Sequence, residues 1–362
     1  MAAAHTPTLP QAGIAAAIPV STFASDALDH ASRSTSQRAR VTIDPTAFQQ
    51  YRHTANEKTT LPRLLLGTVV VILFWLGITA AVLFGGTYAF AVWQASSGTA
   101  PPGGGAVQDF MASPAGILAA LASFAGIWLG LWAAMRWIHR EKLTALIGVS
   151  RRISWSGFLK GLAAVLITSL LSEILLYGLQ PDIARGTIGL SSWLLFLIPI
   201  AALTFLQTSS EEMLFRGYLL RGLASRFQNP FIWALLPGLL FTSLHWSPGS
   251  SAAINACVLA SIAAFALLLT LLVYATGNLG AGFGAHLGNN LTGFLLISHQ
   301  QSYNSFALFN AKPLEAAGWT TSDAVLIAAI GIVSSLLTVL LLLHPRSPLK
   351  VEPDMARASS VR

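Results

Sequence analysis

Residues 191–220 read SSWLLFLIPIAALTFLQTSSEEMLFRGYLL, a mostly apolar run that contains Glu211, Glu212 and Arg216. The run is long enough to cross a bilayer as a helix, which needs about 20 residues. A charged side chain at the centre of a bilayer costs about 2.5 to 3.5 kcal/mol on insertion scales, so such residues are candidates for a functional site. The two adjacent carboxylates therefore indicate both the class of fold and the place of its site.

The composition is that of a polytopic membrane protein. Of the 362 residues, 54% are hydrophobic and 10% are charged, whereas soluble domains carry about 25% charged residues. The single cysteine excludes an intramolecular disulfide framework and a cysteine-based zinc cluster. The net charge of +7 does not indicate a nucleic-acid partner, because the basic residues cluster in loops beside the apolar runs. We expect membrane lipid as the surrounding partner instead.

Hydropathy predicts an all-α fold, a polytopic membrane protein with about eight transmembrane helices. Residues 1–60 are rich in Ala, Ser, Thr and Gln and are predicted to form a poorly ordered N-terminal tail. Residues 61–345 form the predicted transmembrane domain, and residues 346–362 form a C-terminal tail. The eight predicted spans are 64–93, 113–135, 157–178, 191–224, 231–246, 253–275, 280–298 and 324–344.

Loop charges predict the orientation of these spans. Lys and Arg are frequent before the first span, between the second and third, after the fourth and after the eighth. The alternate loops are poor in both, since 94–112 has neither and 299–323 has only Lys312. The positive-inside rule then places the N- and C-termini in the cytosol. The Ala-, Leu- and Gly-rich composition suggests a bacterial protein, so we expect the inner membrane.

Helix geometry separates the two glutamates. At 100° per residue, Arg216 lies about 40° from Glu212 around the helix and about 140° from Glu211. Glu212 and Arg216 thus form a pair four residues apart with the glutamate first, which is the favourable order. Glu211 has no cation on its own face and is free to act as a general base. The alternative is a charge network that only holds helices together.

Two further pairs of polar or aromatic residues share a helix face within apolar spans. Phe241 and His245 are four residues apart in the fifth span, and His286 and Asn290 are four residues apart in the seventh. Each pair alone could be ordinary interhelical packing. If the fourth and fifth spans form a hairpin, His245 lies at about the same depth as Glu211. The sequence therefore allows the three clusters to form one site, without requiring it.

At these residues the chain resembles a known family. The ordered set is similar to the signature of the type II CAAX prenyl endopeptidase family, also called the Abi or CPBP family of intramembrane proteases. The resemblance covers roughly residues 190–300, and the family core would extend over about 157–300. The motifs are EExxxR from Glu211 to Arg216, FxxxH from Phe241 to His245, and HxxxN from His286 to Asn290.

The resemblance implies hydrolysis of a peptide bond inside a membrane cavity. Glu211 would activate the attacking water, and His245 would orient that water or bind a catalytic metal. His286 and Asn290 would stabilise the oxyanion, where one donor can contribute about 3 to 4 kcal/mol. The expected partner is a membrane-associated or lipidated peptide or protein substrate.

The resemblance also implies supporting roles for Glu212, Arg216 and Phe241. It leaves the metal open, because Glu211, His245 and His286 make up a His₂Glu set of the kind that binds catalytic zinc, while the HExxH helix is absent. If zinc took Glu211 as a ligand, Glu212 would have to act as the base despite its pairing with Arg216. We therefore favour a metal-free glutamate mechanism over a metalloprotease, with zinc as the possible cofactor.

Two functions of other classes remain. The first is a non-catalytic membrane scaffold or a bacteriocin-immunity-type protein that uses the buried cluster to bind a partner. The second is a proton-coupled transporter with Glu211 as the carrier site. The chain has no internal repeat, which counts against the transporter.

Overall fold

The structure is a computed structural model that describes residues 45–98, 105–179, 183–300 and 305–355. Residues Ile43–Arg362 form one compact unit, and residues 1–44 of the predicted tail lie outside the described part. The described chain is helical apart from three strands of two residues each. The elements of its first half are α2 (Thr46–Arg52), α3 (Leu61–Ser96), α4 (Ala106–Ala112), α5 (Pro114–Ser123), α6 (Ala125–Ala133), η1 (Ala134–His139), η2 (Leu143–Leu146) and α7 (Trp155–Leu179).

The second half of the chain carries the remaining helices and all three strands. Within it, the fourth apolar run continues unbroken from α8 through a π-helical stretch, η3, into α9. The elements are β1 (Ala184–Arg185), α8 (Leu190–Glu212), η3 (Met213–Leu220), α9 (Arg221–Ala224), η4 (Phe231–Leu235), α10 (Leu236–Ser243), α11 (Ala252–Thr276), α12 (Gly280–Leu291), η5 (Thr292–Leu296), β2 (Ile297–Ser298), β3 (Phe309–Asn310) and α13 (Thr321–Leu343).

Six helical segments in the described residues are long and apolar enough to cross a membrane, so the all-α polytopic fold is confirmed. They are Leu61–Ser96, Pro114–His139, Trp155–Leu179, Leu190–Ala224, Ala252–Thr276 and Thr321–Leu343. Their outer faces carry exposed large apolar side chains, such as Ile198 with 77% of its surface accessible. These faces fit a hydrocarbon environment, and the chain is an integral membrane protein.

The predicted count of eight spans is not confirmed, because two of the expected segments are helical but short. The fifth apolar run forms a helix only over Phe231–Ser243, between Pro230 and the Ser247-Pro248-Gly249 turn. The seventh ends at Leu296, where the backbone becomes extended and enters β2. Both short helices lie among the long ones and carry the histidine motifs.

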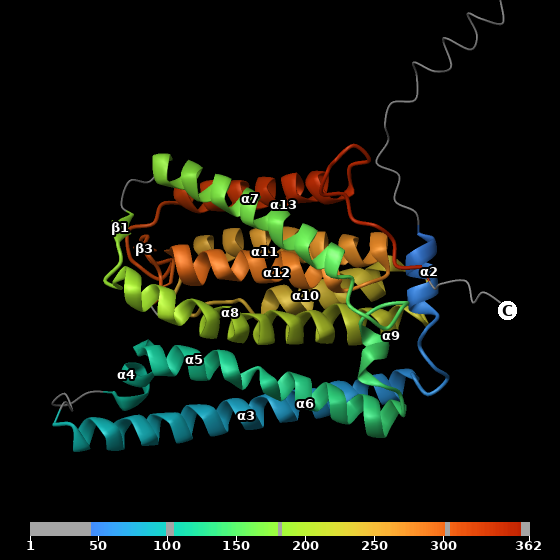
Figure 1. Cartoon of the computed structure of the whole chain (residues 1–362), viewed down its shortest axis with the longest axis horizontal. Helices are drawn as coiled ribbons and strands as arrows, with labels where there is room; N and C mark the ends of the chain where they lie inside the picture. The colour runs from blue at the N-terminus through green and yellow to red at the C-terminus, as the bar shows by residue number, and fades with distance from the viewer. Residues whose placement is uncertain (1–44, 99–104, 180–182, 301–304, 356–362) are drawn as a thin grey trace, which may run out of the picture. The chain divides into compact units, whose positions relative to one another are not determined.

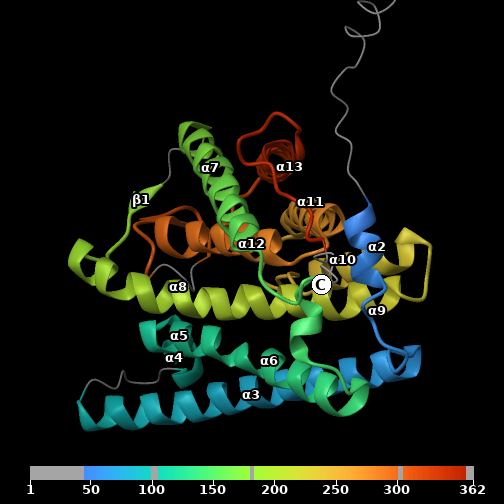
Figure 2. The ribbon, with the colours of Figure 1, turned by 45° about the vertical axis from the view of Figure 1, so that its right-hand side comes forward.

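The helices pack as a lower and an upper group around α8 (Figure 1). In the lower group α3 runs along α5 and α6, and α5 and α6 contact α8. In the upper group α12 packs against α7, α8 and α11, while α13 packs against α7 and α11. Figure 2 shows α12 between α7 and α8. The short helix that carries His286 is therefore enclosed by longer ones.

Small residues allow α12 to approach its neighbours closely. A Cβ atom added at Gly284 would lie 1.9 Å from the carbonyl oxygen of Phe158 in α7, and one at Gly161 would lie 2.2 Å from that of Ala281. The α11–α12 turn depends on Gly277, which has a φ of 63° and lies against the Ala47 carbonyl of α2. Close backbone contact through small residues is the usual means of packing membrane helices. It fixes the position of His286 relative to α8.

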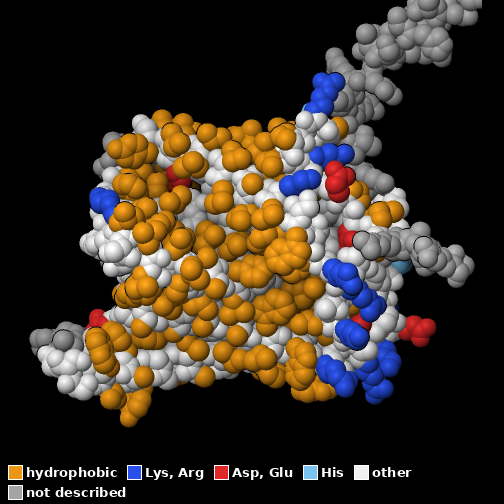
Figure 3. Space-filling model, viewed as in Figure 1, with side chains coloured by type: hydrophobic (Ala, Val, Ile, Leu, Met, Phe, Trp, Pro, Cys, Tyr) orange, Lys and Arg blue, Asp and Glu red, His pale blue; other side chains and the backbone are white. Residues whose placement is uncertain are grey.

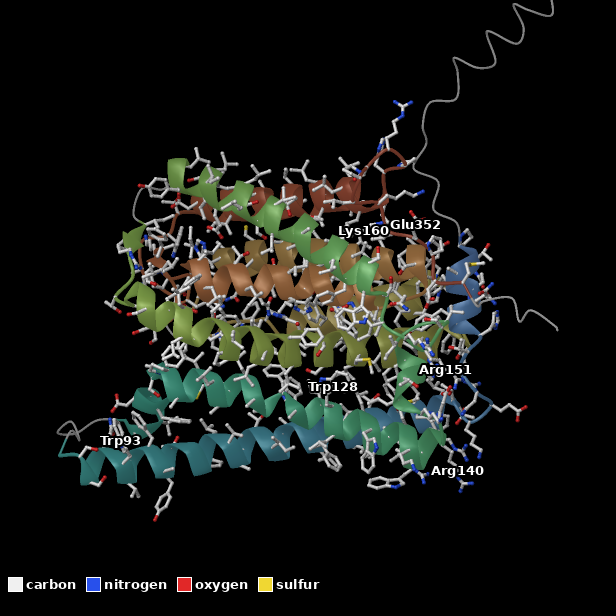
Figure 4. All side chains as sticks on the ribbon, in the orientation of Figure 1. Trp93, Trp128, Arg140, Arg151, Lys160 and Glu352 are labelled. Carbon is white, nitrogen blue, oxygen red and sulfur yellow. The ribbon has the colours of Figure 1, made fainter. Side chains whose placement is uncertain are left out.

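The two ends of the helices differ in charge. Lys and Arg gather at the right-hand end of Figure 3, and the surface between the ends is largely hydrophobic. Figure 4 places Arg140 and Arg151 at this end and Trp93 at the opposite one. Near that opposite end β3 pairs antiparallel with β1 and parallel with β2. The asymmetry of Lys and Arg between alternate loops thus appears in the structure as one basic end and one end poor in basic residues.

The predicted poorly ordered tail over 1–60 is wrong for residues 45–60. Helix α2 buries Phe48 and Tyr51 in the main hydrophobic core, and the Tyr51 hydroxyl donates to the Leu146 carbonyl at 2.6 Å. Burial raises the pKa of Tyr51, which stays a neutral donor. At the other end of the chain, Asp354 accepts from the Asn278 amide at 2.7 Å. Both segments close the basic end of the protein and belong to the folded unit.

Helix α2 also packs against α9 at the arginine-rich end of the fourth apolar run. Arg221 is buried, donating to Glu141 at 2.9 Å and to the Ala145 carbonyl at 3.0 Å. Arg226 donates to the carbonyl of Thr59 at 2.8 Å. The Arg221 charge is therefore compensated inside the protein, whereas Arg226 is exposed.

Candidate active site

The EExxxR motif lies where α8 passes into the π-helical stretch η3. Arg216 Nη1 donates to Glu212 Oε1 at 3.0 Å, and both side chains are inaccessible to solvent, at 1% and 0%. The predicted pair is thus present. Insertions of π-helix within α-helices are frequently found at functional sites.

Arg216 has two more partners beyond Glu212. Its Nη2 donates to the Ala266 carbonyl of α11 at 3.2 Å, and its guanidinium lies over the Phe241 ring at 4.5 Å. A buried cation held by a carboxylate, a carbonyl and an aromatic face is well compensated. Phe241 therefore has the structural place expected of a supporting residue.

His286 on α12 joins the two glutamates. Its Nδ1 lies 2.9 Å from Glu212 Oε1, and its Nε2 lies 3.5 Å from Glu211 Oε2. Glu212 has its Oε1 between Arg216 and His286, so an Nδ1 proton on His286 is held in place. The Nε2 contact with Glu211 is longer than a regular hydrogen bond. The positions of the two glutamates around the helix predict different roles for them. The contact of His286 with both carboxylates, however, depends on tertiary packing.

The Glu212 carboxylate is held by close packing as well as by its hydrogen bonds to Arg216 and His286. A Cβ atom at Gly282 would lie 3.2 Å from its Oε2, which has no hydrogen-bond partner among the described residues. Glu211 by contrast retains 9% of its surface accessible and faces the Nε2 of His286. Glu212 is locked into the scaffold, whereas Glu211 keeps some freedom to bind water.

A cavity of about 280 Å³ opens beside these residues. His245, His286 and Asn290 all line it, together with Phe241, whose ring lies 4.8 Å from the His245 ring and 5.7 Å from that of His286. The structure thus brings the three motifs to one place. This volume suits a short peptide segment or a small ligand.

His245 and Asn290 are oriented by neighbours. His245 Nδ1 lies 2.9 Å from the Phe241 carbonyl, which leaves its Nε2 available to another group. Asn290 accepts at its Oδ1 from the Asn289 amide at 3.2 Å, so its own NH₂ is free to donate. Among the described residues no hydrogen bond or ion pair links His245 to Glu211, so His245 is not part of the carboxylate cluster.

The residues as placed do not fit the His₂Glu zinc set. Glu211 and His286 lie close enough to share an ion, but His245 does not join them. Across residues 45–98, 105–179, 183–300 and 305–355, no three His, Cys, Asp or Glu side chains gather in a group that could hold a metal ion. We therefore derive no chemical step through a metal.

Sequence reasoning missed several residues of the cavity wall, among them two amides and a phenylalanine. Gln207 lies one helical turn before Glu211, and Asn289 orients Asn290. Phe265 places its ring 5.8 Å from that of His286. The polar pair could have been found as amides within apolar spans, but nothing distinguishes Phe265 from the other apolar residues of α11.

Comparison with known proteins agrees with this geometry. Residues 190–292 match the family model described as type II CAAX prenyl endopeptidase, Rce1-like. The predicted resemblance is confirmed. The matched residues contain all three motifs, and the family is a peptidase family.

One curated relative is an uncharacterised protein, YyaK, of Bacillus subtilis (strain 168). It is 25% identical over 211 residues, which cover 56% of this chain and 70% of YyaK. No solved structure matches the chain significantly. The match to the Rce1-like family model is therefore the comparison that indicates a reaction, namely peptide hydrolysis.

Proposed function

We propose that the protein is an intramembrane endopeptidase that hydrolyses a peptide bond in a membrane-associated or lipidated substrate. The observation that carries the proposal is the different environment of the two adjacent glutamates. Glu212 is fixed by Arg216 and His286, whereas Glu211 keeps only the looser contact with His286. A base and its rigid support, beside a cavity, form the minimum of a hydrolytic site.

In this mechanism the Glu211 carboxylate takes a proton from water as the water oxygen attacks the scissile carbonyl carbon. The carbonyl oxygen becomes an oxyanion, which accepts hydrogen bonds from Asn290 Nδ2 and from a protonated His286 Nε2. When the C–N bond breaks, Glu211 returns its proton to the leaving nitrogen, and the products are a carboxylate and an amine. His245 Nε2 helps to orient the water. No metal takes part in these steps.

The orientation follows the polarity of charge. The basic end, with both described chain ends near it, faces the cytosol, and the strand-bearing end faces the opposite side. We place the protein in the inner membrane of a bacterium. Because the matched family is described as a CAAX prenyl endopeptidase, a prenylated CAAX tail is one candidate substrate.

The decisive experiment compares the membrane peptidomes of cells that carry the wild-type protein or Glu211→Gln. Gln has nearly the same shape as Glu but cannot act as a base, so peptides produced by the enzyme should disappear. Glu352→Gln, an exposed change at the basic end, is the matched control and should leave the peptides unchanged. An identical peptidome for Glu211→Gln, with normal membrane insertion, would refute the proposal and favour a non-catalytic role.

A further inference from the structure

A second cavity, of about 340 Å³, lies next to the active-site cavity. It is bounded by α7, α11, α12 and α13, which lie together in the upper part of Figure 2. The walls of the two cavities share five residues, which are Ile262, Phe265, Asn289, Gly293 and His299. A group bound in this second cavity, the side chamber, would therefore be a neighbour of the proposed reaction centre.

The hydroxyl groups of the side chamber present acceptors to its interior. Four of them donate their proton to the backbone carbonyl four residues earlier in their own helix, which leaves the oxygen lone pairs for another partner. Because the Thr338 proton goes to the Ser334 carbonyl, Thr168 donates to the Thr338 hydroxyl at 2.8 Å and keeps lone pairs of its own. The four are Ser172, Thr292, Ser335 and Thr338, with donor–acceptor distances of 2.9, 3.0, 3.0 and 2.9 Å.

The side chamber also holds a carboxylate. Glu173 Oε2 lies 3.4 Å from His299 Nε2, and 17% of the Glu173 side chain is accessible, so a ligand can reach it. Asn289 donates to Asn290, which leaves the Asn289 carbonyl oxygen as another acceptor. None of the described residues that line the chamber is Lys or Arg. Among its described residues the chamber thus combines one carboxylate with a set of acceptors, and His299 is the basic residue beside that carboxylate.

We propose that the side chamber binds a primary ammonium group, and that in proteolysis this group is a lysine side chain of the substrate. An ammonium carries a positive charge and three N–H donors, which match the carboxylate and the acceptors. The chamber wall also includes Leu176, Ile327 and Ile330, against which the methylene stem of a lysine can pack. An anionic ligand would find no Lys or Arg among the described wall residues and would be repelled by the Glu173 carboxylate.

The assignment of the ammonium to a substrate lysine rests on the proposed function. Because Asn289 lines both cavities and orients Asn290, a lysine in the side chamber would hold the adjacent peptide bond near the oxyanion donor. The chamber then acts as a specificity pocket. Cleavage sites should carry a lysine within a few residues of the bond that is broken.

Binding can be measured without a known substrate, using the purified full-length protein in detergent. The probe is n-hexylammonium, and the matched probe is hexyltrimethylammonium, which has the same chain and charge but no N–H donor. We expect n-hexylammonium to bind at least tenfold more tightly than hexyltrimethylammonium in isothermal titration calorimetry. Equal binding of the two probes, or no saturable binding of either because the chamber holds only water, would overturn the proposal.

Variants locate the binding. Glu173→Gln should weaken n-hexylammonium binding at least tenfold. Ile330→Trp, which fills the chamber from α13, should weaken it equally and serves as the test if Glu173→Gln fails to fold. Glu352→Gln and Glu211→Gln should bind as the wild type does. Unchanged binding in a folded Glu173→Gln or Ile330→Trp protein would show that the ammonium binds elsewhere.

The same variants separate this proposal from the proposed function. If n-hexylammonium binding depends on Glu173 but no peptide depends on Glu211, the proteolytic function and the lysine assignment fail, while the ammonium site stands. If Glu211-dependent peptides exist but their cleavage sites lack lysine or persist in Glu173→Gln, the lysine assignment fails alone. Support requires lysine near the cleaved bonds and their loss in Glu173→Gln.

Discussion

In its described residues the membrane domain holds two carboxylate–histidine pairs, and they are built differently. In the first, His286 contacts both glutamates, and Arg216 neutralises Glu212 in a fully enclosed cluster. In the second, Glu173 and His299 meet at 3.4 Å, and both remain partly accessible. The first pair has a scaffold that fixes one carboxylate and leaves the other to react. The second pair has no scaffold of this kind and can exchange its partner for a ligand.

The largest expected effect is a loss of catalysis without a loss of stability when Glu211 is replaced. Glu211→Gln should lower kcat by about 100- to 10,000-fold, because general-base catalysis typically contributes this much. The unfolding temperature should change little, since Glu211 is not the partner of Arg216. The measurement is single-turnover cleavage of a substrate found in the peptidome comparison, with Glu352→Gln as the control. A residual kcat within threefold of wild type would remove Glu211 from the mechanism.

The next effect tests the scaffold of the first pair. Arg216→Ala leaves Glu212 buried without its cation, and removing one partner of a buried ion pair costs about 3 to 5 kcal/mol of unfolding free energy. Thermal unfolding in detergent should show the loss, and Arg346→Ala, an exposed arginine, should change the unfolding temperature little. An equally small change for Arg216→Ala would mean that the cluster is not the rigid support that distinguishes the two pairs.

A smaller effect concerns the packing that places His286. Gly284→Ala would set a Cβ atom 1.9 Å from the Phe158 carbonyl oxygen, and such overpacking costs about 1 to 3 kcal/mol. Gly178→Ala in α7 is the matched control, because its Cβ atom would meet nothing within 4 Å. We expect only Gly284→Ala to lower both the unfolding temperature and the cleavage rate. Equal behaviour of the two variants would contradict the close α7–α12 contact.

The sequence predicts the first pair better than the second, and the reason is physical. Contacts four residues apart, such as Glu212 with Arg216, follow from local helix geometry and are present. The bridge from His286 to both glutamates joins residues 74 positions apart and requires the packing of α12 on α8. No local pattern carries such information, and only the ordered motif set indicated it.

The same limit applies to the fold. Six long spans were predictable because each is apolar over its own length, as hydropathy requires. The short helix that ends just before His245 and the one that carries His286 are predicted as full spans, because an apolar run does not show where its helix ends. The polar composition of residues 1–60 predicts disorder over α2. Phe48 and Tyr51 are nevertheless buried there, by partners far along the chain.

The smallest expected effect is the loss of unfolding free energy when the contact between Glu173 and His299 is removed. His299→Ala removes a contact between partly accessible groups, and polar contacts between membrane helices average about 0.6 kcal/mol. The unfolding free energy should therefore fall by less than about 1 kcal/mol, as measured by reversible unfolding in mixed micelles. His286→Ala, read in the same assay, should lose several times more, because it leaves Glu212 with one partner fewer in a fully buried site. If the two histidine variants lose the same stability, the pairs do not differ in scaffold, and the distinction between a reactive site and an exchangeable one would lose its structural basis.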